Sequence, residues 1–217
     1  RKNKEFMLLG LSATPIINHL KEGKSLLELI TGIVYDDLQT RPFLMNAVKL
    51  YEHFTNISIR HLVDYKNANL LYTDVEAPFP EKKDYPHIRN SPLGVEVLLK
   101  EARIPEILDK IDGPTIIYTE YVGSSDDKRS RRIIDMLKDA VEGAGHTVAI
   151  YTGKDHSGKD LFIRGMRDVL IASRPIAVGV NGLQHITNRL IINTLPWTNA
   201  NYQQLIGRLI RYGQKAE

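Results

Sequence analysis

The sequence contains no cysteine, which excludes disulfide bridges and thiolate metal sites and is compatible with a reducing compartment. Long apolar runs are missing as well, because the longest ones, such as Val178–Val180 and Leu190–Asn193, have only the length of a strand. A membrane-spanning helix needs roughly 20 apolar residues, so we expect no membrane partner. Low-complexity tracts and internal repeats are also absent. The sequence therefore predicts a globular protein.

The sequence also lacks a large excess of charge of either sign. The 29 basic and 26 acidic residues leave a formal net charge of +3, which by itself does not argue for nucleic acid. The seven histidines are scattered without the spacing of metal ligands, and we expect no metal site among them. The chain begins with Arg1 instead of an initiator methionine and shows no secretory signal, so we expect a fragment of a longer protein.

What the sequence does contain is a regular alternation of elements in its C-terminal part. Residues 16–66 are predicted to be mostly helical, and three prolines between Ala77 and Pro86 favour a linker. From about residue 93 strands alternate with helices. The predicted strands are 115–119, 147–151, 169–172 and 190–193, and the predicted helices are 94–103, a short one opened by Pro105, one through 133–141, 160–167 and 199–211. This order predicts a parallel sheet with helices on both faces and a ligand site beyond the carboxyl ends of its strands.

The predicted helix 199–211 has two unlike faces. One face is apolar and carries Leu205, Ile206, Leu209 and Ile210. The other is polar and carries Gln204, Gly207, Arg208 and Arg211. Two arginines one turn apart, beside a glycine that lets another backbone come close, are suited to clamp the charge of a phosphate. The alternative, ordinary solvated arginines on an amphipathic helix, stays open at this point.

Two weaker features flank this helix. Gly179 and Gly182 follow a predicted strand, where glycine permits a positive φ and a close approach to a ligand, although an ordinary tight turn has the same signature. Trp197 is interpreted as a packing residue, because a lone aromatic gives no stacking series for bases. The segment from Gly23 to Ser25 is not a phosphate-binding loop, because Asn18 stands where that loop requires its first glycine.

Five short motifs occur in an order that resembles a known family. They are Leu11–Pro15, Thr115–Thr119, Thr152–Gly153, Gly179–Asn181, and Gln204–Arg211 followed by Gly213 and Gln214. The series resembles the superfamily 2 helicases, and it looks most like their SWI/SNF-type branch of ATP-driven DNA translocases. The resemblance implies an α/β fold with a RecA-like parallel sheet. It divides the chain into the end of a first RecA-like lobe (1–15), a helical bridge with the proline-rich linker (16–92), and a second RecA-like lobe (93–217).

The resemblance also implies roles for individual residues. Arg208 and Arg211 would be arginine fingers that reach a γ-phosphate, with Gln204 beside it to orient the pair. The residues implied to contact the nucleotide are Gly179, Asn181, Gly182 and Gly207. The residues implied to contact DNA are Thr119, Thr152, Ser173 and Gln184. Ser12, Ala13 and Thr14 match the motif that couples hydrolysis to movement of the lobes.

The function implied is ATP-dependent translocation on nucleic acid, with double-stranded DNA as the expected partner and an intracellular location in the cytoplasm, nucleoid or nucleus. ATP and Mg²⁺ would be held mainly by the N-terminal lobe of the same protein. The phosphate-binding loop and the acidic Mg²⁺ motif do not occur in this sequence. We therefore expect the full-length protein to hydrolyse ATP and this chain alone to be inactive. A strand-separating DNA or RNA helicase and a non-catalytic scaffold lobe are the alternatives.

Overall fold

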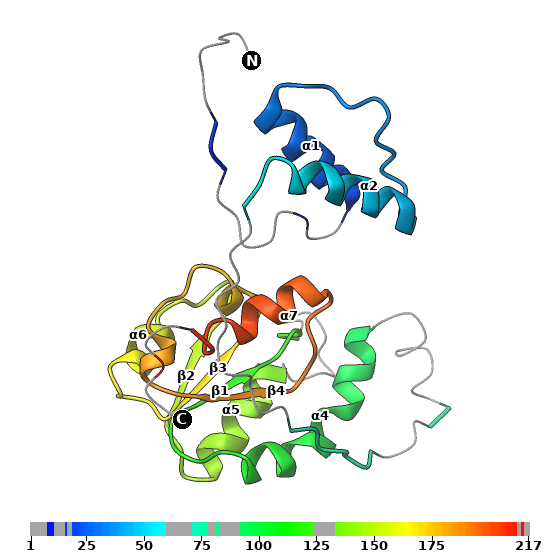
Figure 1. Ribbon diagram of the computed structural model, residues 1–217. Helices are drawn as coiled ribbons and strands as arrows, with labels where there is room; N and C mark the ends of the chain where they lie inside the picture. The colour runs from blue at the N-terminus through cyan, green and yellow to red at the C-terminus, as the bar shows by residue number, and fades with distance from the viewer. Residues whose placement is uncertain are drawn as a thin grey trace. The chain divides into compact units, whose positions relative to one another are not determined.

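The computed structural model describes residues 8–10, 16, 19–59, 71–77, 81–82, 92–123, 133–211 and 214. The chain forms two compact units, residues 1–64 and 65–217 (Figure 1), and each is described by itself. Ser12, Ala13 and Thr14 lie outside the described residues. The predicted division at residues 15 and 92 stays a prediction.

The described part of the first unit is built on the helices α1 (Leu20–Thr31) and α2 (Leu44–Thr55), as the sequence predicts for this mostly helical segment. The two helices pack around a small core of Leu27, Leu38 and Leu50. Gly23 makes their close approach possible, because a Cβ at this position would lie 2.7 Å from a methyl carbon of Leu50. The helix α1 ends at Gly32, whose φ of 71° favours glycine.

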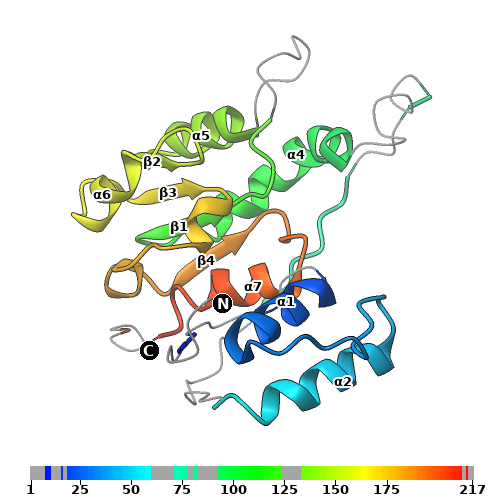
Figure 2. The ribbon, with the colours of Figure 1, turned by 90° about the horizontal axis from the view of Figure 1, so that it is seen from above.

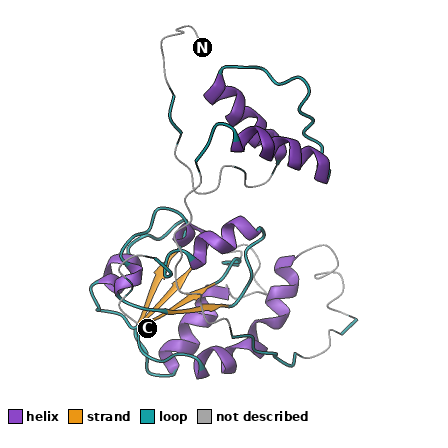
Figure 3. Ribbon diagram, in the orientation of Figure 1, coloured by secondary structure: helices purple, strands orange, loops and turns teal. Residues whose placement is uncertain are grey.

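The second unit contains a parallel sheet of four strands in the part of the chain that the structure describes (Figure 3). The strands are β1 (Thr115–Tyr118), β2 (Val148–Tyr151), β3 (Val169–Ala172) and β4 (Arg189–Ile192). Their order across the sheet is β2-β3-β1-β4, and every pair is parallel. The buried apolar run in β3 suits an inner strand that is covered on both faces. The predicted α/β class and the parallel sheet are confirmed.

Helices cover both faces of this sheet (Figure 2). The helices α4 (Pro92–Asp109) and α5 (Ile133–Gly143) pack on one face, in a cluster with Ile117 and Ile171. The opposite face is covered by segments that pack with Ile116 and Tyr118. These segments are α6 (Gly158–Ile163), α7 (Asn199–Ile206) and the short 3-10 helices η1 (Arg174–Ala177) and η2 (Leu183–His185).

Pro105 does not open a new helix, contrary to the sequence prediction. It lies inside α4, which runs through it without a break. A proline here removes one main-chain hydrogen bond of the helix. Ile104, Ile107 and Leu108 pack against the cluster on this face of the sheet, and we attribute the continuity of the helix to that packing.

The start of α6 lies directly against the backbone of β2. A Cβ at Gly158 would be 2.2 Å from the carbonyl oxygen of Ile150 and 2.5 Å from its nitrogen. Real side chains cannot occupy that space, so the position requires glycine. This close approach places Phe162, which is fully buried, in the core beside Tyr151.

Candidate functional site

The sheet topology marks one edge of the second unit as the place for a site. The helix that follows β1, α5, packs on one face of the sheet, whereas η1, which follows β3, packs on the other. The strands β1 and β3 are neighbours in the sheet. Their connections therefore leave two adjacent strands toward opposite faces. Such a switch point in a parallel sheet creates a crevice beyond the carboxyl ends of the strands. The residues just after β1 and β3 are therefore candidates for function.

The four residues implied to contact DNA are all buried, and three of them directly follow a strand. Thr119 comes after β1, where its hydroxyl donates to the carbonyl of Tyr121 at 3.1 Å. Thr152 comes after β2, and its Oγ1 accepts hydrogen bonds from the main chain of the following loop at 3.2 and 3.3 Å. Ser173 follows β3, and Gln184 lies in η2, where its Oε1 accepts from the Gly182 N–H at 3.1 Å. The hydrogen bonds of Thr119, Thr152 and Gln184 shape the loops, and contact of the four residues with DNA stays a prediction.

A buried carboxylate occupies the switch point, and the sequence did not reveal it. Glu120 follows β1, and its side chain is only 1% exposed. The hydroxyl of Tyr118 donates to Oε2 of Glu120, and Nε of Arg174 donates to Oε1. Burial, together with the hydrogen bond to Glu120, raises the pKa of Tyr118 far above its ordinary value. Both carboxylate oxygens thus have a partner, and Arg174 fastens η1 to the end of β1.

A second buried carboxylate fastens α4 to the end of β4. Arg103 donates from Nη1 to Oε2 of Glu96 at 2.6 Å and to the carbonyl of Asn193 at 3.0 Å. The hydroxyl of Thr194 also donates to Oε2 of Glu96, at 3.1 Å. Each charge in this cluster is paired, as buried charges require. The signal in the sequence was a glutamate and an arginine seven positions apart on one predicted helix, which is too common to single them out.

The C-terminal helix is shorter than predicted. It begins behind Thr198, whose side chain accepts a hydrogen bond from the Asn201 N–H, and it ends at Ile206 instead of Arg211. After that point the main chain tightens, with bonds from Arg208 N–H to Leu205 O and from Leu209 N–H to Ile206 O. We attribute this ending to contacts that are distant in sequence. Leu209 is buried in the core, and both arginines reach the loop that follows η1.

Arg208 and Arg211 both bind this loop, defined here as residues 177–182 and so including Ala177, the last residue of η1. Arg208 donates from Nε and Nη2 to the carbonyl of Ala177, at 2.9 and 2.7 Å, and from Nη1 to the carbonyl of Val180 at 3.2 Å. Arg211 donates from Nη1 to Oδ1 of Asn181 at 2.9 Å. The structure thus brings together three of the residues that the sequence singled out, although their acceptors are all uncharged.

The charge of this pair is not neutralised within the described residues. None of the ion pairs found there includes Arg208 or Arg211. Burial, and then the positive charge of Arg211, lowers the pKa of Arg208. Two neighbouring guanidinium groups that bind only neutral oxygens form a positive site, which suits an anion such as a phosphate.

The three glycines near the arginines differ in whether the backbone requires a glycine. Gly179 and Gly182 have φ values of 73° and 95°, so the predicted positive φ is confirmed at both. Gly207 is exposed, and a Cβ added there would meet only carbonyl oxygens of Gln203 and Gln204, at 3.1 and 3.7 Å. Within the described residues, therefore, no other chain segment comes close at Gly207. Gln204 lies one turn earlier, in the last turn of α7.

Trp197 lies beyond the carboxyl end of β4 and is less packed than the sequence suggested. The residue is 60% exposed. Its ring meets that of Tyr121 edge-on, with centroids 6.3 Å apart. The prediction of a packing residue is wrong for most of its surface, because Trp197 belongs to the connection that leaves the sheet after β4.

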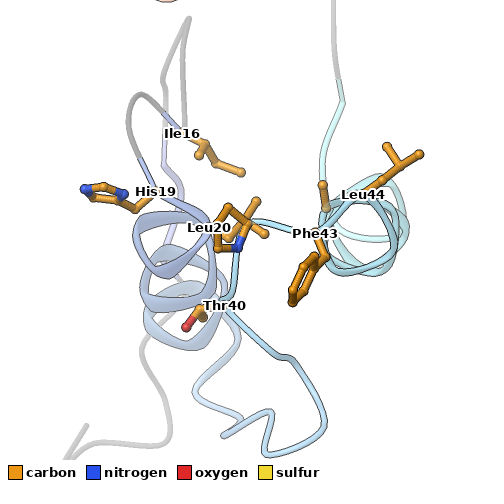
Figure 4. Close-up of a pocket in the computed structure, with 8 residues that line it drawn as sticks. Ile16, His19, Leu20, Thr40, Phe43 and Leu44 are labelled. Carbon is orange, nitrogen blue, oxygen red and sulfur yellow. The ribbon is translucent and has the colours of Figure 1, made fainter.

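The described residues offer few other sites. They contain no group of histidine, aspartate and glutamate side chains that could hold a metal ion. No helix among them has both the length and the apolar character needed to cross a membrane. The first unit has a shallow groove of about 360 Å³ near the starts of α1 and α2 (Figure 4). Its lining is mostly apolar and consists of Ile16, His19, Leu20, Thr40, Pro42, Phe43, Leu44 and Ala47.

Comparisons with known proteins add one informative relative. No protein-family model matches the sequence. Over 121 residues the chain is 32% identical to a Bacillus subtilis (strain 168) protein described as the uncharacterized ATP-dependent helicase YqhH. This similarity agrees with the resemblance to helicases seen in the sequence motifs. The match covers 54% of this chain and only 20% of YqhH, so the chain spans about a fifth of that relative's length.

One solved structure is similar to this chain in a looser way. It is the crystal structure of the C-terminal part of the Fun30 ATPase domain, which is 16% identical in sequence. The similarity covers 64% of this chain and 41% of the Fun30 chain, with a TM-score of 0.38. The α/β class of the second unit is established by its own parallel sheet.

Proposed function

We propose that this chain is the C-terminal motor lobe of an ATP-dependent DNA translocase of the SWI/SNF type, and that it works as part of a longer protein. The observation that carries the proposal is the pair Arg208 and Arg211, in which two neighbouring guanidinium groups bind only neutral oxygens. The similarity to the helicase YqhH supports it.

The chemistry required of this pair is the neutralisation of charge on a transferring phosphoryl group. A guanidinium presents planar, forked N–H donors that match phosphate oxygens. Arginines that reach a γ-phosphate from a second lobe raise the rate of hydrolysis by roughly 10³–10⁵ in other systems. In this proposal ATP and Mg²⁺ are held mainly by an N-terminal lobe, and binding of double-stranded DNA closes the two lobes.

A non-catalytic scaffold lobe is the second candidate, and one observation favours it. Arg208 makes three hydrogen bonds to main-chain carbonyls, so this arginine has a structural use without any phosphate. Arg211 has no equivalent main-chain contact among the described residues, and its single bond is to the Asn181 side chain. A scaffold would explain Arg208 and leave Arg211 without a purpose.

The experiment that separates the two candidates is an ATPase assay on the full-length protein, with and without double-stranded DNA. Arg211→Ala is expected to lower kcat by about 10³-fold or more, because the developing phosphoryl charge loses its partner. Arg164→Ala, an exposed arginine at the end of α6, is the matched control and should leave kcat unchanged. Turnover that is equal in Arg211→Ala and the parent protein would exclude the finger assignment. Single-stranded DNA and RNA in the same assay identify the nucleic acid that stimulates turnover.

A further inference from the structure

The two arginines of the pair hold the loop in different ways. Arg208 donates three N–H groups to two main-chain carbonyls, those of Ala177 and Val180. Main-chain carbonyls move only with the loop itself, so Arg208 is fixed to it and fixes it in turn. Arg211 donates one N–H to a side-chain oxygen, Oδ1 of Asn181. A side-chain amide can rotate while the loop keeps its shape.

The donors that remain also differ between the two arginines. An arginine has five N–H donors. The bonds to described residues use three of them in Arg208 and one in Arg211. Arg211 therefore keeps enough donors for bidentate binding of a phosphate while its bond to Asn181 stays in place. Arg208 would have to give up main-chain bonds to move toward a ligand.

Asn181 has the chemistry needed to orient Arg211 without weakening it. The residue is exposed and lies between Gly179 and Gly182, on the loop that Arg208 fixes. An amide oxygen orients a guanidinium by a hydrogen bond and leaves its full positive charge available to an anion. A carboxylate at the same place would orient it equally well and cancel that charge. A neutral acceptor is therefore the suitable partner for an arginine that binds phosphate.

We propose that Asn181 is a positioning residue for Arg211: its side-chain oxygen holds the guanidinium ready for the γ-phosphate of a nucleoside triphosphate, and it does not itself contact the nucleotide. The proposal rests on the proposed function, because it assumes that Arg211 reaches that phosphate. It assigns Asn181 a task different from the nucleotide contact that the family resemblance implies.

A double-mutant cycle in the full-length protein tests this assignment. The variants are Asn181→Ala, Arg211→Ala and the two combined, and kcat and KM for ATP are measured with saturating double-stranded DNA. We expect Asn181→Ala to lower kcat by about tenfold, the effect of one lost hydrogen bond to a charged group, with KM for ATP nearly unchanged. The combined variant should match Arg211→Ala alone, because Asn181 acts only through that arginine.

The controls make each outcome decisive. Asn56→Ala, at an exposed asparagine that ends α2 in the first unit, should leave kcat unchanged. Thermal unfolding of Asn181→Ala should match the parent protein, since the residue is exposed and the rest of the loop keeps its bonds to Arg208. Losses that add in the combined variant, or a rise in KM for ATP in Asn181→Ala, would show that Asn181 acts independently of Arg211 and would overturn the inference alone. Unchanged turnover in Arg211→Ala would overturn the proposed function and this inference together.

Discussion

Arginine serves two purposes in the second unit, and the difference lies in what it binds. Arg174 binds the buried carboxylate of Glu120, and the pair joins η1 to β1. Arg208 and Arg211 bind neutral oxygens of the neighbouring loop. The charge of an arginine that binds a carboxylate is neutralised inside the protein. An arginine without a carboxylate partner keeps a positive charge that can bind a ligand. The acceptor, more than the arginine itself, separates a structural residue from a candidate site residue.

Among the changes that test this comparison, the largest effect is expected when the second cluster is made to resemble the first. Asn181→Asp places a carboxylate against Arg211, as Glu120 lies against Arg174. We expect kcat of the full-length protein to fall by about 100-fold, because the positive charge offered to the phosphoryl group is cancelled. Urea unfolding should show a change of less than about 1 kcal/mol, since the new ion pair is exposed. If Asn181→Asp kept full turnover, the charge of Arg211 would not be needed for hydrolysis, and the contrast with Arg174 would be wrong.

An intermediate effect is expected from the structural cluster. Arg174→Ala leaves the buried Glu120 without its positive partner, although Tyr118 still donates to it. The free energy of unfolding should fall by about 1–3 kcal/mol, a loss moderated because the Arg174 side chain is itself 63% exposed. Urea titration of this chain measures the loss directly. Stability equal to that of the parent chain would mean that the Glu120 carboxylate does not depend on Arg174.

The smallest effect is a pH dependence that belongs to the same cluster. The pKa of Tyr118 is raised in the folded state by burial and by its hydrogen bond to Glu120. The folded chain therefore keeps a proton that the unfolded chain releases above about pH 10, and stability falls as the pH rises further. Tyr118→Phe cannot ionise, so its free energy of unfolding should decline less steeply above that pH. Urea unfolding at increasing pH measures both chains. If the free energy of unfolding declined equally in Tyr118→Phe and the parent chain, Tyr118 would not be the cause of the pH dependence.

The sequence predicted the sheet well because its signals are local. Four short apolar strands, separated by helical segments, are enough to predict a parallel sheet that is covered on both faces, and the strand bounds differ from the prediction by no more than one residue at either end. The positive φ of Gly179 and Gly182 followed from their place after a strand.

The features that sequence reasoning missed depend on contacts between distant residues. Arg208 meets Ala177 across 31 positions, and Glu120 meets Arg174 across 54. We attribute the early end of α7 to the first of these contacts. The helical pattern of the sequence continues to Arg211, whereas the helix itself ends at Ile206. The acceptors of Arg208 and Arg211 could not be predicted from the sequence either, although they distinguish these arginines from Arg174.

The contact between Gly158 and the backbone of Ile150 also limits which sequences can adopt this lobe. Any side chain at position 158 would push α6 away from β2 and remove Phe162 from the core. Random replacement of this codon, followed by selection for soluble folded protein, should therefore return glycine. The same requirement gives a simple filter for recognising distant sequences that share this arrangement: a glycine at the point where the chain enters the short helix after the second strand.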